Sequence, residues 1–288
     1  MVQIGFASSD TPNTIGNDTT RIICRALLNV LPSHNIYGAK NEFLLAQAYY
    51  YGFNVERNKE IAFSLFNKAL YNGEIRSAKY LAYSYYNNDM SESDALEAAR
   101  LQKKYVQYIS GKGAETKKII DERRILVRYL IDSFNLNDAL TVSEENIRMC
   151  QEDSISFIHS YLDRVEILTH DVPLFDTVLD YLNTYKDKII DYSSLDEDEA
   201  ILSLRIRYLF ALYYFNVQEY KKAYTYINEF SDTCFKNDIY INFEHLYLSS
   251  QTLFLLANIL EKLEDKKESI EVYMNAFVMS SFEKGLSL

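Results

Sequence analysis

Apolar residues return at intervals of three and four along most of the chain, which is the period of a helix buried on one face. Residues 1–18 are an exception, because Ser, Thr, Asn and Asp dominate there, and we expect a loose N-terminal arm. No segment alternates apolar and polar residues for long enough to predict a β-strand. The pattern therefore predicts an all-α chain with helices over 20–31, 37–51, 58–71, 75–87, 91–111, 115–134, 136–150, 154–169, 172–191, 197–215, 219–235, 242–263 and 266–282.

Composition supports this fold class. The 288 residues include only 8 Gly and 3 Pro, which is too few for the frequent turns of a β-sandwich or a doubly wound sheet. The N-terminus has neither the basic nor the apolar part of a secretory signal, and no stretch is long and apolar enough to insert into a membrane. The three cysteines lie far apart and form no metal-ligand or disulfide pattern. We therefore expect a cytoplasmic protein.

Charge is distributed unevenly along the chain. Residues 145–288 carry 13 basic and 25 acidic side chains, which argues against nucleic acid as a partner, because binding phosphates requires clustered Lys and Arg. Residues 100–128 are locally basic, with nine Lys and Arg against three acidic residues. This stretch predicts either solvated helix faces or a docking patch for an acidic partner, including the acidic half of another copy in a homo-oligomer.

A short motif recurs at a fixed distance. Leu-Ala-x-x-Tyr stands at 45–49 and again, 36 residues later, at 81–85. The first block continues with Gly52, Asn54 and Asn58, and with Ala and aromatic residues over 62–73. This series resembles the Sel1-like repeat, with Asn54 in place of a Gly and Asn58 in place of an Asp. Asn suits both positions, because it tolerates positive φ and also caps helices.

The C-terminal third carries a related pattern. In 210–214 and 256–260 an apolar residue is followed by Ala and, three residues later, by Tyr or Leu, and a further small residue stands twelve positions after the Ala. This spacing resembles the tetratricopeptide repeat. Small residues at 46, 82, 211 and 257 would let the two helices of a hairpin approach closely, and stacked hairpins would bury what a single hairpin cannot. The resemblance implies a right-handed superhelical solenoid over 19–288, with a Sel1-like part at 20–113, irregular hairpins at 114–200 and a tetratricopeptide-like part at 201–288.

The recurring Ala positions also predict which residues face the concave groove of such a solenoid. The residues six and three places before each Ala, and one and four places after it, point into the groove. In the N-terminal part they make a basic and aromatic surface, a common chemistry of interface hot spots. A Tyr-rich composition explains the same tyrosines without a groove, and both interpretations stay open. The predicted partner-binding residues are Lys40, Gln47, Tyr50, Arg76, Lys79, Tyr83, Tyr86, Arg205, Tyr208 and Asn258.

No catalytic, cofactor or metal motif is present in the sequence, and the four histidines are isolated. Tyr83 and Leu212 stand where a carboxylate-binding tetratricopeptide groove would need Asn, so a clamp for peptide termini is not expected. We expect a non-enzymatic scaffold or adaptor that holds a peptide or protein. Two alternatives remain, namely a dedicated chaperone or immunity-type protein that masks one secreted protein, and an enzyme with a site within 115–200.

Overall fold

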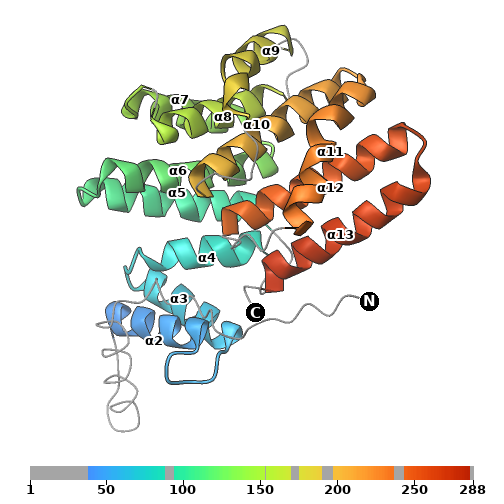
Figure 1. The fold of residues 1–288 in the computed structure, drawn as a ribbon. Helices are drawn as coiled ribbons and strands as arrows, with labels where there is room; N and C mark the ends of the chain where they lie inside the picture. Colours follow the sequence, from blue (N-terminus) through green and yellow to red (C-terminus); the bar gives the residue numbers. More distant parts are fainter. Residues whose placement is uncertain are drawn as a thin grey trace. The chain divides into compact units, whose positions relative to one another are not determined.

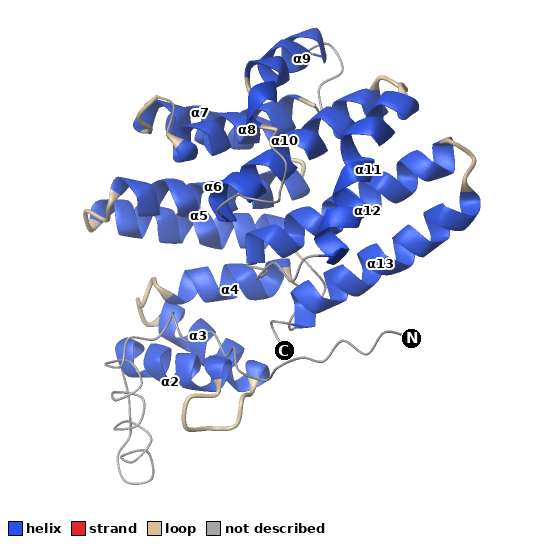
Figure 2. Cartoon of the chain, viewed as in Figure 1, coloured by secondary structure: helices blue, strands red, loops and turns tan. Residues whose placement is uncertain are grey.

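We describe the protein from a computed structural model, which covers residues 38–87, 94–152, 154–169, 175–189, 197–236 and 243–285. The expected arm at 1–18 and the expected helix at 20–31 lie outside these residues. The prediction of an all-α fold is confirmed, because twelve α-helices and one 3₁₀ turn are the only regular elements of the described residues (Figures 1 and 2). The chain forms two compact units, Met1–Gly111 and Lys112–Leu288.

The first unit contains two helical hairpins among its described residues. Helices α2 (Ala39–Tyr51) and α3 (Lys59–Tyr71) form one, and α4 (Ser77–Tyr86) and α5 (Ala95–Gly111) form the other. Each of these four helices carries a completely buried Ala, namely Ala46, Ala62, Ala82 and Ala98. The spacing from the small residue of the first helix to that of the second is therefore sixteen in both hairpins.

Two local signals in the first unit act as the sequence predicts, and one helix start differs. Asn54 has a φ of 59°, and the Asn58 side chain accepts a hydrogen bond from the Ile61 amide and so caps α3. The helix expected over 91–111 begins later than predicted, at Ala95, because the Asp94 carboxylate accepts a hydrogen bond from the amide of the third helical residue.

The described residues of the second unit form four hairpins. They are α6 (Thr116–Asp132) with α7 (Leu136–Met149), α8 (Ile155–Leu168) with α9 (Phe175–Thr184), α10 (Glu197–Asn216) with α11 (Tyr220–Lys236), and α12 (Phe243–Lys262) with α13 (Lys266–Gly285). The first helices of successive hairpins contact one another in the order α6, α8, α10 and α12. Neighbour-to-neighbour contact of this kind is the organisation of a helical-repeat array.

Twelve residues separate the buried small positions in three of these hairpins. Ala211 and Ala223 are completely buried, and Ser269, opposite Ala257, is 3% exposed and donates a hydrogen bond to the Ala257 carbonyl. The same spacing joins Val127 to Ala139 in α6 and α7, which are 1% and 0% exposed. Part of the stretch expected to hold irregular hairpins therefore has the same spacing, with Val in place of Ala.

The helix expected over 172–191 is shorter in the structure. Helix α9 ends at Thr184, and the 3₁₀ turn η2 (Lys186–Lys188) follows it. The Tyr185 amide donates to the carbonyl three residues earlier, at Leu182, instead of four, so the α-helical ladder stops there. The right-handed superhelical path over the whole chain stays a prediction.

Candidate partner-binding face and a buried ion cluster

Aromatic side chains of α2, α3 and α4 form one cluster in the first unit. The Tyr80 ring stacks on the Phe66 ring with 4.5 Å between centroids, and it meets the rings of Tyr50 and Phe43 edge-on at 5.5 and 5.7 Å. Pairs in these geometries add to the apolar burial of each ring. Tyr50 of α2, expected to face a groove, therefore packs against Phe66 of α3 and Tyr80 of α4 and is half-buried there.

Hydrogen bonding fixes the hydroxyl end of the same cluster. The Gln47 side-chain amide donates to the Tyr80 hydroxyl at 2.6 Å. Burial, with smaller effects from neighbouring tyrosines, raises the pKa of Tyr51 well above its usual range, so this phenol stays neutral. Sequence reasoning did not identify Tyr80. It lies two residues before Ala82, so it points to the opposite side of α4, which is the side that meets α2.

Two cationic side chains near this aromatic cluster lie over aromatic rings. The Arg76 guanidinium lies 4.5 Å from the Phe43 ring centroid, and the Lys79 ammonium lies 5.7 Å from that of Tyr105. Both distances are within the range of a cation–π interaction. Arg76 also donates two hydrogen bonds of 2.7 Å to the Glu74 carboxylate. This fork-to-fork contact lowers the pKa of Glu74 and raises that of Arg76.

The remaining N-terminal candidates surround these groups. Lys40 is exposed near the start of α2, and its charge contributes to the lowered pKa of Glu74. Tyr83 and Tyr86 are half-buried on α4. The structure thus places Gln47, Tyr50 and Arg76 in one contact network through Tyr80, Phe66 and Phe43. We call the seven N-terminal candidates the first-helix face, and they are Lys40, Gln47, Tyr50, Arg76, Lys79, Tyr83 and Tyr86.

The three C-terminal candidates do not form a comparable surface. Tyr208 is half-buried and packs against the apolar clusters of the second unit. Asn258 is occupied within its own hairpin, because it accepts a hydrogen bond of 2.9 Å from the Tyr273 hydroxyl. Arg205 is 7% exposed. Its expected place in an open groove therefore differs from its position in the structure, inside a cluster of charges.

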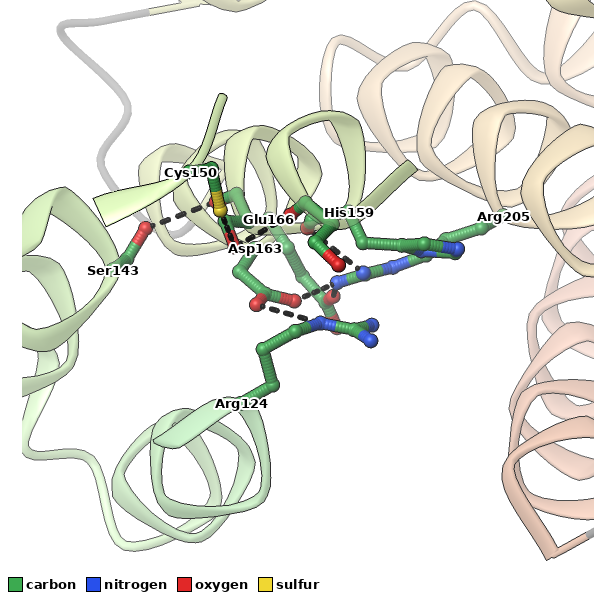
Figure 3. Close-up of polar contacts among 9 residues, drawn as sticks. Arg124, Ser143, Cys150, His159, Asp163, Glu166 and Arg205 are labelled. Carbon is green, nitrogen blue, oxygen red and sulfur yellow. Dashed lines mark hydrogen bonds and ion pairs between the residues drawn. The ribbon is translucent and has the colours of Figure 1, made fainter. Parts of the chain in front are cut away.

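This ion cluster joins three first helices of the second unit (Figure 3). The Asp163 carboxylate of α8 accepts hydrogen bonds from Arg205 of α10 and, at 3.3 Å, from Arg124 of α6. Arg205 also donates at 3.1 Å to the Glu166 carboxylate and to the His159 carbonyl. Two guanidinium groups thus neutralise two carboxylates, which compensates the cost of burying charge.

The position of Asp163 explains why the cluster forms there. Val127, Ala211 and Ala257 each stand five residues before the end of their first helix, and in α8 this place is taken by Asp163. Glu166 follows three residues later, where the tetratricopeptide-like blocks have Tyr214 or Leu260. Helix α8 therefore presents carboxylates where its neighbours present apolar side chains.

A small polar seam lies beside the ion cluster. The Ser143 hydroxyl donates at 3.2 Å to the Ser160 carbonyl, and the Cys150 thiol lies 4.0 Å from the Ser160 hydroxyl (Figure 3). Burial raises the pKa of the Cys150 thiol, which is the opposite of what a reactive thiolate needs. Among the residues that the structure describes, no group of three or more His, Cys, Asp or Glu could hold a metal ion.

Comparison with known proteins finds similarity among solved structures but not among family models or curated sequences. No protein-family model matches the sequence, and no curated protein is significantly similar to it. Among solved structures, the chain is similar to a Sel1 repeat protein from Oxalobacter formigenes, with 14% sequence identity and a TM-score of 0.44. The alignment covers 92% of this chain and 97% of the other. The sequence motif at 45–73 resembles the same repeat family.

The assignment of this chain to the all-α class rests on its own helices.

In the part of the chain described here, no helix combines the length and the apolar character needed to cross a membrane.

Proposed function

We propose that the protein is a scaffold or adaptor and that the first-helix face holds a protein or peptide partner. The observation that supports this proposal most directly is the pair of cations over aromatic rings, Arg76 over Phe43 and Lys79 over Tyr105. Arginine and tyrosine are the residue types that contribute most at protein interfaces. Six of the seven candidate positions lie on α2 and α4, and Arg76 directly precedes α4.

The chemistry of this face favours an acidic partner with an apolar anchor. Lys40, Arg76 and Lys79 supply positive charge, and Glu74 neutralises only part of it. Tyr50 is already held by its ring contact with Tyr80, whose hydroxyl accepts the Gln47 hydrogen bond. Little side-chain freedom is then lost when a partner binds, which lowers the entropic cost of association.

A peptide selection tests the proposal. A displayed library of random peptides is selected on the immobilised full-length chain, and we expect enrichment of peptides rich in Asp and Glu with an apolar residue. The double variant Lys79→Ala with Tyr83→Ala should lose these peptides while its helical circular dichroism stays unchanged. Lys104→Ala, which removes an exposed lysine from α5, is the matched control and should bind as the parent does.

Unchanged binding by the double variant would show that the first-helix face is not the binding surface. Equal loss in Lys104→Ala would show that only the overall charge of the protein matters.

The chaperone or immunity alternative rests on the acidic half of the chain. The 25 acidic side chains in 145–288 could cover a basic partner, and such a complex should weaken as salt screens the charges. Selected peptides rich in Lys and Arg, released by high salt, would favour this alternative over the first-helix face.

The enzyme alternative concerns 115–200, where the ion cluster brings several ionisable groups together. Its carboxylates are engaged by Arg124 and Arg205, which suits them to hold helices in place. We therefore propose a structural role for the cluster.

A further inference from the structure

The sulfur of Met149, the last residue of α7, lies against a cationic side chain of α6. The Arg123 guanidinium donates a hydrogen bond from Nη1 to Met149 Sδ at 3.3 Å, and its Nη2 lies 3.0 Å from the Glu145 carboxylate of α7. The Arg123 side chain is 20% exposed and Met149 is 38% exposed. The ion pair thus holds the guanidinium beside a sulfur-bearing side chain that solvent reaches.

A thioether is a poor partner for a guanidinium group. Sulfur is a weak hydrogen-bond acceptor, whereas a charged N–H donor makes its strong hydrogen bonds to oxygen. Oxidation of methionine to the sulfoxide adds an oxygen atom and makes the side chain polar. Arg123 is therefore a better partner for the oxidised form of Met149 than for the reduced form.

We propose that Met149 is an oxidation site for peroxides and that Arg123 holds the resulting sulfoxide, so that oxidation strengthens the contact between α6 and α7. The sulfur lone pair attacks one oxygen of hydrogen peroxide and the O–O bond breaks. The hydroxide that leaves takes the proton of the transferred oxygen and becomes water, so the sulfur loses the two electrons that the peroxide gains. Rotation about the flexible Cγ–Sδ bond of this half-exposed side chain turns the new oxygen towards the guanidinium.

Cys150 is the next residue and a second target for peroxide, but its chemistry differs. A cysteine reacts as the thiolate, and burial raises the pKa of the Cys150 thiol. A thioether carries no proton, so its oxidation needs no ionisation. Small thiols also reverse sulfenic acids and disulfides, whereas a methionine sulfoxide needs a dedicated reductase. A thiol wash after peroxide therefore restores Cys150 and leaves Met149 oxidised.

A thermodynamic cycle in the full-length chain tests the proposal. Met90, Met274 and Met279 are replaced by Leu in every variant, which leaves Met149 as the one internal methionine. The protein is treated with hydrogen peroxide and then with dithiothreitol, and peptide mass mapping confirms one added oxygen at residue 149. Hydrogen exchange over 116–149, measured by mass spectrometry, reports how often this hairpin opens before and after oxidation, with Arg123 and in Arg123→Gln.

With Arg123 present, we expect oxidation to slow exchange over 116–149. In Arg123→Gln, oxidation should instead accelerate it, with a difference of about tenfold between the two effects, because the sulfoxide is left without its charged donor. The loss of the Glu145 pair acts on the reduced and the oxidised variant alike, so it cancels in the cycle. Since that carboxylate is 46% exposed, the pair is of the surface kind and Arg123→Gln should fold.

Arg148→Gln is the matched control. It removes an exposed arginine that precedes Met149 in the sequence and lies 3.6 Å from the Glu144 carboxylate. Oxidation should slow exchange in this variant as it does with both arginines present.

Equal effects of oxidation in the presence of Arg123 and in Arg123→Gln would show that the guanidinium does not hold the sulfoxide, and would overturn the proposal. Faster exchange after oxidation with Arg123 present would overturn it as well. So would a Met149 that stays reduced in the unsubstituted chain under conditions that oxidise Met274, which is 65% exposed.

Discussion

Among the described residues, four that are not glycine have positive φ, and three of them occupy the same place in the second unit. Phe134, Gln218 and Glu264 have φ of 59°, 64° and 68°, and each stands two residues after the end of the first helix of a hairpin. At each site the backbone amide of the residue with positive φ donates to the carbonyl three residues before it. The amide of the next residue donates to the carbonyl five residues before that one. This turn is usually made with Gly, because an L side chain in the left-handed region costs free energy.

Replacing Glu264 by Gly should therefore stabilise the protein. We expect the free energy of unfolding to rise by about 1 kcal/mol, since Gly adopts this φ without the steric penalty. Urea denaturation followed by circular dichroism measures the change. Glu271→Gly, in the interior of α13, is the matched control and should lose about 1 kcal/mol instead. A loss in both variants would contradict this explanation of the turn.

Glu74 makes the stability of the first unit depend on pH. Hydrogen bonds from Arg76 lower the pKa of its carboxyl below the ordinary value of 4.5, so the folded state holds the proton more weakly than the unfolded state does. The stabilisation is therefore complete above pH 4.5 and is lost as the pH falls through the lowered pKa. Thermal melting of the parent and Glu74→Gln should show a difference at neutral pH that shrinks in acid. A difference independent of pH would exclude this linkage.

At the scale of elements, hairpin spacing was the most informative feature of the sequence. It predicted the close approach at Ala46, Ala82, Ala211 and Ala257, and all four are completely buried. It did not show that the expected hairpin over 115–150 has the same spacing, because Val127 stands where the recurring motif has Ala. Nor did the periodicity show that the helix expected over 172–191 ends at Thr184, since a change to a 3₁₀ turn leaves the apolar pattern almost intact.

The ion cluster links α8 to both neighbouring first helices, so its disruption should weaken the second unit. Asp163→Asn removes the charge that faces Arg124 and Arg205 but keeps the side-chain size. We expect a loss of about 3–5 kcal/mol in the free energy of unfolding, measured in urea, because a buried charge is left uncompensated.

Glu144→Gln is the matched control for this experiment. It breaks the exposed pair with Arg148 on α7 and should cost at most about 0.5 kcal/mol. Equal effects of the two substitutions would show that the cluster is no more important than a surface ion pair.

For the molecule as a whole, the sequence predicted the fold class better than the site. Positions relative to an Ala identify the side of a helix, and the structure joins three of the ten candidates so chosen, Gln47, Tyr50 and Arg76, in one network. They do not reveal which residues of a neighbouring helix lie against that side. For this reason Tyr80 was missed and Arg205 was expected in an open groove. The burial of Arg205 depends on Asp163, 42 residues earlier, and no local pattern carries that information.

Division into two units predicts that a perturbation stays within its own unit. Glu42 is 4% exposed on α2 and accepts from Lys68 and Asn72 of the α3 side, at 3.0 and 2.7 Å. In Glu42→Gln, we expect hydrogen exchange measured by mass spectrometry to rise over 39–86 and to stay unchanged over 197–277, since repeats contact only their neighbours. Equal acceleration in both regions would mean that the chain unfolds as one cooperative unit.

The contact between Asn72 and Glu42 also bears on how fast the protein deamidates. Asn72 precedes Gly73, and an unhindered glycine amide nitrogen can attack the preceding side-chain carbonyl, close a succinimide and release ammonia, after which water opens the ring to aspartate or isoaspartate. In the folded turn that nitrogen donates to the Leu70 carbonyl, while the Asn72 amide is held by Glu42, so folding delays the reaction. Once it occurs, a new carboxylate faces Glu42, and the hairpin of α2 and α3 loses the hydrogen bond that protected it.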